Sequence, residues 1–142
     1  MKLYRVLALA LAIVMMGCIL VACDQKEPEQ TEKTIVVRFT VKDGPDKDSN
    51  ILIQDPEYAY KYKGDADPTI TEVLIDICEF EEIAIEFKDE SQETITKIGN
   101  KSAGDGKFWT YALNGVNDLD NPMYVQTVTE GDIIVVYLDS IN

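Results

Sequence analysis

The chain has 142 residues, of which 46% are hydrophobic, with a formal net charge of −13 and no histidine. This length suits one domain of ordinary size. The acidic balance argues against a nucleic-acid partner, because phosphate binding needs clustered lysine and arginine. The lack of histidine excludes Ser-His-Asp triads, Cys-His pairs and zinc sites that use histidine.

The N-terminal segment has the pattern of an export signal. Lys2 and Arg5 precede an uncharged run of 17 residues, from Val6 to Ala22. A positive start, an apolar core and small residues at the end are typical of a secretory signal. A membrane-spanning helix is the alternative, but it needs about 20 apolar residues. We therefore predict a signal peptide over residues 1–22.

Residues 20–23 read Leu-Val-Ala-Cys and resemble the lipobox of bacterial lipoproteins, whose cysteine is lipidated and becomes the new N-terminus. Cys18 is a rival site, but the chain stays apolar after Cys18 and turns polar directly after Cys23. The resemblance implies lipidation at Cys23. The protein would then be exported and lipid-anchored to the bacterial cell membrane on its extracytoplasmic side, without spanning it.

Residues 23–33 are polar and charged, and they predict a flexible tether between the lipid and a folded domain over residues 34–142. Once the signal is removed and Cys23 is lipidated, Cys78 is the only cysteine left, so no disulfide is expected. A lone cysteine on an apolar helix face is most often a small buried hydrophobic residue.

The folded domain begins with strand patterns. Thr34–Val41 alternates apolar and polar residues, which is typical of a strand, and Asp43–Pro45 ends it. Ile51–Ile53 is a candidate second strand, and tyrosines alternate again between residues 58 and 62.

One helix follows, and it is the clearest single element. Thr69 and Glu72 form a capping box, Pro68 suits a helix start, and the helix is predicted to run to about Phe80. Its apolar residues follow helical spacing and predict one buried face, made of Ile70, Val73, Leu74, Ile77 and Cys78.

Strand patterns resume at Ile83–Phe87, Thr94–Ile98 and Phe108–Leu113, and Asn114-Gly115 is a strong turn signal. The last run, Ile133–Leu138, is apolar on both faces, as a central buried strand should be. Strands, one helix and further strands predict an α+β fold with a β-grasp-like sheet packed on the helix.

One acidic segment invites a calcium interpretation. Asp46, Asp48 and Asn50 have the 1, 3, 5 spacing of an EF-hand loop, and Glu57 falls at position 12. However, Ile51 stands where the sharp turn needs glycine, and the flanks look like strands. We interpret the segment as a polar loop between strands and predict no metal site.

The only tryptophan, Trp109, and Tyr111 lie two residues apart and therefore share one face of a strand, opposite Phe108. If that face is turned outward, the two rings form a binding platform. If it is turned inward, they are part of the core, which the pattern slightly favours.

Residues 106–115 read Gly-Lys-Phe-Trp-Thr-Tyr-Ala-Leu-Asn-Gly and resemble the Gly-x-x-Trp-x-Tyr-x-x-Asn-Gly segment of transcobalamin-like C-terminal domains. Residues 127–134 resemble the closing Gly-Asp turn and final strand of that family, and residues 69–74 resemble its helix start. At residues 98–100 the usual Ile-Asn-Gly is replaced by Ile-Gly-Asn. The resemblance covers about residues 34–139.

The resemblance implies a small β-rich domain of bacterial surface proteins, a family usually of unknown function. In animal cobalamin carriers the similar domain closes over a corrinoid held by a separate α-barrel, which these 142 residues do not include. The resemblance implies that the domain binds cobalamin or another corrinoid as a ligand and does not use it as a catalytic cofactor. The implied ligand-binding residues are Trp109, Tyr111, Asn114 and Gly115.

The sequence therefore favours a non-enzymatic, membrane-anchored surface lipoprotein with a ligand-binding domain. The alternative is a protein-interaction or adhesion module at the cell surface, which an exposed sheet edge would favour. An enzyme ranks last, because acidic pairs arise by chance among 26 Asp and Glu residues.

Overall fold

The structure is a computed structural model, and it describes residues 31–141. The predicted signal peptide, Cys23 and most of the predicted tether lie outside the described residues. Within residues 31–141, no helix has the length and apolar character needed to cross a membrane.

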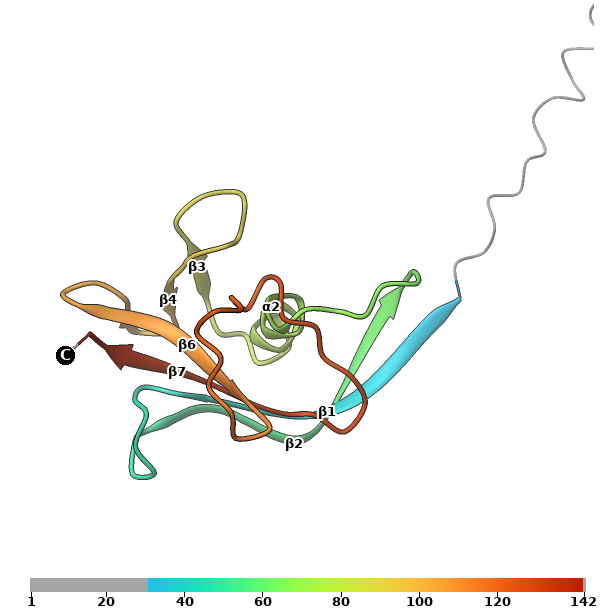
Figure 1. The fold of residues 1–142 in the computed structure, drawn as a ribbon, viewed down its shortest axis with the longest axis horizontal. Coiled ribbons are helices and arrows are strands. Elements are labelled where there is room, and N and C mark those ends of the chain that lie inside the picture. Colours follow the sequence, from blue (N-terminus) through green and yellow to red (C-terminus); the bar gives the residue numbers. More distant parts are fainter. Residues whose placement is uncertain (1–30, 142) are drawn as a thin grey trace, which may run out of the picture. The chain divides into compact units, whose positions relative to one another are not determined.

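A four-stranded sheet forms the centre of the domain (Figure 1). β1 (Glu32–Lys42) pairs antiparallel with β2 (Ile51–Lys63) and parallel with β7 (Ile133–Ser140). β6 (Lys107–Leu113) pairs antiparallel with β7, which gives the order β2-β1-β7-β6. The first and last strands therefore lie side by side in the middle of the sheet, and the prediction that the final run is a central strand is confirmed.

β1 and β2 are both longer than the sequence pattern predicts. β1 begins at Glu32, which pairs with Lys63, so the end of the predicted tether already belongs to the sheet. β2 is one strand of 13 residues, although Pro56 separates its two predicted parts. The register with β1 shifts opposite Pro56, and this bulge accommodates the proline without ending the strand.

The single described helix, α2 (Ile70–Phe80), packs on one face of this sheet (Figure 1). The predicted capping box is present: the Thr69 backbone N–H donates to Glu72 Oε2 (2.7 Å), and the Glu72 N–H donates to Thr69 Oγ1 (3.3 Å). All five predicted apolar residues of its inner face are buried, and the α+β prediction is confirmed. Burial raises the pKa of the Cys78 thiol to about 11, as expected for a packing residue.

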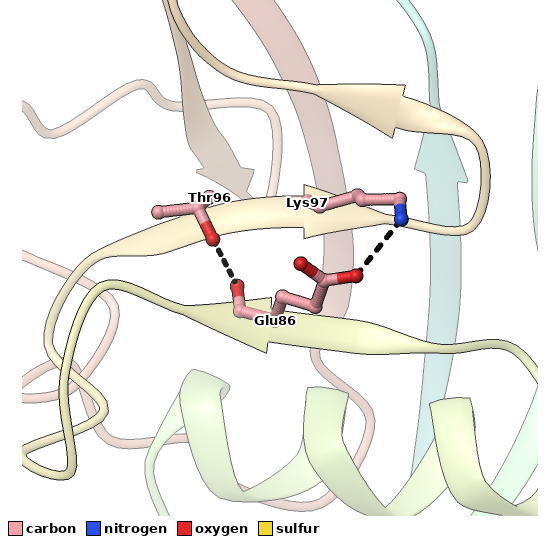
Figure 2. A network of polar contacts seen from close by, with 3 residues as sticks. All are labelled: Glu86, Thr96 and Lys97. Carbon is pink, nitrogen blue, oxygen red and sulfur yellow. Dashed lines mark hydrogen bonds and ion pairs between the residues drawn. The ribbon is translucent and has the colours of Figure 1, made fainter.

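A second, three-stranded sheet consists of β3 (Ile85–Phe87), β4 (Ile95–Ile98) and β5 (Lys101–Ser102), in that order. Ile95 and Ile98 of β4 enter the same core as the helix. Figure 2 shows polar contacts between β3 and β4 of this sheet. Lys97 Nζ lies 2.8 Å from Glu86 Oε1, and Thr96 Oγ1 donates to the Glu86 carbonyl oxygen (3.1 Å).

Candidate ligand-binding site

Trp109 and Tyr111 face the core. In the β6–β7 register, Trp109 lies opposite Leu138 and Tyr111 opposite Val136, and both β7 residues are buried in the central cluster. The Trp109 side chain is 7% exposed and Tyr111 is 2% exposed. Of the two alternatives that the sequence left open, the outward platform is therefore not formed.

Tyr111 also holds the chain segment that follows β6. Its hydroxyl donates to the Asn121 carbonyl oxygen (2.6 Å), and burial, with a smaller effect of the nearby Asp118 charge, raises the pKa of Tyr111. The indole Nε1 of Trp109 is buried and has no hydrogen-bond partner among the described residues. These contacts indicate a packing role for both rings, and their role in ligand binding stays a prediction.

The segment from 116 to 128 crosses from β6 to the start of α2 before it reaches β7 (Figure 1). The Ile70 and Thr71 backbone N–H groups donate to the Gln126 carbonyl (2.9 Å) and the Met123 carbonyl (3.2 Å). Amides in the first turn of a helix have no partner within the helix. The segment therefore completes the helix N-terminus and is fixed by it.

A cavity of about 180 Å³ lies between β6 and this segment. Both candidate rings reach its wall, together with side chains of the segment and of the β3–β4 loop. Its lining residues are Glu93, Phe108, Trp109, Thr110, Tyr111, Asp118, Leu119, Asn121, Pro122 and Met123. The space is large enough for a substituent of a ligand, but it is below the volume range of typical small-molecule sites.

Exposed apolar side chains gather on the same segment. Among the described residues with large exposed apolar side chains, four lie within residues 116–125, which we call the apolar loop. They are Val116, Leu119, Tyr124 and Val125. Leu119 is 71% exposed and also lines the cavity, so the apolar loop and the cavity share this residue. From the sequence this stretch was noted only for its oxygen-rich side chains, and its four apolar residues were not predicted as a site, although they were a visible signal.

Asn114 and Gly115 form the predicted turn. Both have positive φ (52° and 82°), and the Leu113 and Val116 backbones exchange two hydrogen bonds of 2.9 Å across them. The Asn114 side chain is fully engaged: Nδ2 donates to Asp132 Oδ1 (2.8 Å), and Oδ1 accepts from the Ile133 N–H (2.9 Å). This amide ties the end of β6 to the start of β7, so Asn114 has a structural role whether or not it binds a ligand.

Asp132 belongs to the same connection. Its second carboxylate oxygen accepts from the Thr129 N–H (2.8 Å), and its carbonyl oxygen accepts from the Arg38 N–H of β1 (2.9 Å). The Asn-Gly and Gly-Asp turns are the motifs that carry the family resemblance. In this structure they join β6, β7 and β1, so the motifs specify the fold more directly than they specify a ligand.

The EF-hand-like spacing falls in the β1–β2 connection and in β2. Asn50 closes the turn through its backbone N–H and its Nδ2, which donate to the Asp43 carboxylate (2.8 Å each), and Lys101 Nζ lies 3.0 Å from the same group. These three interactions lower the pKa of Asp43, with the Asn50 side chain the largest cause. Within residues 31–141, no group of three or more His, Cys, Asp or Glu side chains is placed to hold a metal ion.

A second concavity, of about 550 Å³, lies between β2 and α2, and we call it the edge cleft. Tyr58 and Phe80 both line it and meet edge to face, with ring centroids 6.1 Å apart, and the Tyr58 hydroxyl donates to Asp76 Oδ2 (2.5 Å). Four of its eight lining residues carry carboxylates; the lining consists of Asp55, Glu57, Tyr58, Ala59, Lys61, Asp76, Glu79 and Phe80. From the sequence only Glu57 was considered, as a calcium ligand, and the cleft itself was not predicted, because the helix and the strand come together only in the fold.

Comparisons with known proteins find similarity among solved structures only. No family model matches the sequence, and no curated protein matches it. A candidate metal-binding protein from Ruminococcus gnavus ATCC 29149 is 18% identical, with 76% of this chain and 99% of that chain covered and a TM-score of 0.45.

Haptocorrin in complex with Cbi is 13% identical to this chain, with a TM-score of 0.54. The match covers 84% of this chain but only 28% of haptocorrin, so the described domain corresponds to a small part of that protein. At this identity the likeness concerns the fold alone: a small α+β domain of a kind that also occurs in haptocorrin.

Proposed function

We propose that this protein is a membrane-anchored surface lipoprotein whose domain binds a ligand without catalysing a reaction, and that the ligand is cobalamin or another corrinoid. The export signal and the lipidated Cys23 are inferred from the N-terminal sequence. The non-enzymatic assignment is supported by the lack of histidine in the sequence and by the burial of Cys78, which removes its thiol from substrates.

The apolar loop is the single observation that carries the ligand-binding proposal. Val116, Leu119, Tyr124 and Val125 are exposed on a segment whose two ends are fixed, at one end by Asn114 and at the other by α2. Exposed apolar side chains that cluster next to a cavity mark interaction sites more often than scattered ones do.

The corrinoid is named from two concordant lines of support. The sequence resembles transcobalamin-like C-terminal domains, and the fold resembles a part of haptocorrin, which has been seen in complex with Cbi. A corrinoid is much larger than 180 Å³, so its flat face would lie on the apolar loop while a peripheral group enters the cavity. Trp109 and Tyr111 would then contact the ligand only where they line that cavity.

The alternative function, a protein-interaction module, is favoured by a different observation. β2 ends the four-stranded sheet, and the edge cleft lies beside it. An open edge strand is a template for pairing with an extended segment of another protein.

Equilibrium dialysis of the full chain in a neutral detergent against cobalamin tests the corrinoid proposal. Because the cavity is small and the apolar loop is exposed, we expect a dissociation constant on the order of micromolar, or about −8 kcal/mol. Replacing Leu119 and Val125 by serine should weaken binding about tenfold, because it removes apolar contact area.

The matched control is Ile51→Ser on β2, since Ile51 is 52% exposed and Val125 is 53% exposed. Ile51→Ser should leave the dissociation constant unchanged. No measurable binding by the wild-type chain, or equal affinity in the loop variant, would overturn the corrinoid proposal.

A further inference from the structure

β2 is an edge strand of the four-stranded sheet. In the sheet order β2-β1-β7-β6, β2 pairs with β1 on one side and has no strand partner on the other among residues 31–141. A strand of 13 residues in this position presents backbone N–H and C=O groups to the surroundings.

Only the second half of this edge is suited to accept another strand. Pro56 and the bulge opposite it interrupt the first half, and proline and bulges are common protections of sheet edges. From Tyr58 to Lys63 the register with β1 is regular and the sequence contains no proline. This half carries two lysines, Lys61 and Lys63, but they alternate with the tyrosines and therefore point to the face of the strand opposite Tyr58. An added strand would therefore pair along residues 58–63.

The face that such a strand would meet is acidic. α2 runs beside β2, and Glu72, Asp76 and Glu79 follow one another at spacings of four and three residues, which places them on one side of the helix. Asp76 is hydrogen-bonded to Tyr58 of β2, which shows that this side is turned toward the strand. The edge cleft adds the carboxylates of Asp55 and Glu57 and contains one lysine.

The cleft also has an apolar part. Phe80, at the end of α2, is 70% exposed although its ring packs edge to face against Tyr58. A phenyl ring in this position can accept the aliphatic stem of a long side chain and attract its cationic end.

We propose that residues 58–63 of β2 accept an extended, lysine- or arginine-rich segment of a partner protein as an additional strand, whose alternate basic side chains enter the edge cleft over Phe80. Backbone pairing supplies affinity in this mode, and the pockets for alternate side chains supply specificity. Charge complementarity identifies the partner as basic.

Two other possible occupants, a second copy of this chain and a small free amine, fit the cleft less well than a basic segment does. A second copy of this chain would bring a second set of the same carboxylates to the interface, which opposes self-pairing. A small free amine would match the carboxylates but would leave the backbone of the edge unpaired. This interaction is independent of the corrinoid proposal, because the edge cleft and the apolar loop share no residue.

Fluorescence anisotropy with the full chain in a neutral detergent tests the proposal. The probe is a short labelled peptide in which lysine alternates with threonine. We expect saturable binding that weakens with added salt. Two control peptides, one with glutamate in place of lysine and one N-methylated on the edge that would pair with β2, should bind at least about tenfold more weakly.

A protein variant locates the site. Glu57→Gln combined with Glu79→Gln should weaken binding of the lysine peptide about tenfold. The same change of charge at Glu90 and Glu93, both exposed in the β3–β4 loop, should have no effect. The variants need thermal melts like that of wild type, which their exposed positions lead us to expect.

Three results would overturn the proposal. The N-methylated peptide could bind as well as the unmodified one, which would exclude strand pairing. A simple diamine could displace the peptide at equal concentration, which would make the cleft an amine site. Sedimentation could show a dimer that the Glu57 and Glu79 changes dissociate, which would identify a second copy as the occupant.

Discussion

At the scale of single residues, substitution of Trp109 tests whether its side chain packs in the core. Its ring is buried opposite Leu138, so Trp109→Ala should lower the free energy of unfolding by about 3–5 kcal/mol. Urea unfolding at neutral pH measures this loss. A variant as stable as wild type would contradict the burial of the ring.

The unpaired indole N–H of Trp109 allows the stability costs of two substitutions, Trp109→Phe and Trp109→Ala, to be compared. Trp109→Phe keeps an aromatic ring and removes the buried donor that lacks a partner. Removing an unsatisfied buried polar atom offsets part of the lost packing. Trp109→Phe should therefore cost clearly less than Trp109→Ala, and an equal cost would mean that the N–H is satisfied by water.

Tyr58 gives a prediction about pH. Burial first, and then the hydrogen bond to Asp76, raise the pKa of Tyr58 in the folded state. The stabilisation from the neutral phenol is therefore complete below the unfolded pKa of about 10 and is lost as pH rises through the higher folded value. Tyr58→Phe should cost about 1–3 kcal/mol near neutral pH.

The cost of Tyr58→Phe should then shrink at alkaline pH. Unfolding of wild type and variant at about pH 8 and about pH 11 measures this change. Tyr124→Phe, on the exposed apolar loop, is the control and should show little difference at either pH. A cost that is independent of pH would contradict the assigned contact between Tyr58 and Asp76.

At the scale of elements, substitutions on the buried face of α2 test the core most directly. Leu74 is fully buried, and Leu74→Ala should lower the free energy of unfolding by about 2–5 kcal/mol. Ile75→Ala, one residue further and only partly buried, should cost less. Calorimetric melting of both variants checks this order, and a melting temperature of Leu74→Ala within a degree of wild type would contradict it.

The elements also show what sequence patterns can and cannot predict. The helix was predictable to within a residue, because capping and helical spacing are local signals. β5, with two residues, was missed, since no periodicity can be recognised over so short a stretch. β2 was divided at Pro56, because the bulge that tolerates the proline depends on the register with β1.

The candidate sites also differ in how far the sequence alone could predict them. The burial of Trp109 and Tyr111 follows from which face of β6 meets α2, and the alternation along one strand does not specify that face. The apolar loop could have been recognised from its composition. The edge cleft could not, because it depends on β2 lying at the edge of the sheet and on α2 lying beside it.

At the scale of the whole molecule, the membrane anchor depends on one residue outside the described part of the chain. If Cys23 is lipidated, Cys23→Ala should move the protein from the membrane fraction to the soluble or uncleaved pool. Cell fractionation with an immunoblot measures this, and Cys18→Ala is the matched control. Normal processing and unchanged membrane attachment of Cys23→Ala would exclude the predicted lipidation.

The ligand-binding function is the central claim, and hydrogen–deuterium exchange of the full chain with and without cobalamin tests it most directly. We expect slower exchange in peptides covering residues 108–127, where β6, the cavity and the apolar loop lie together, and unchanged exchange in β2 and α2. No difference at a saturating concentration of cobalamin, or protection confined to residues 51–80, would contradict the proposed site.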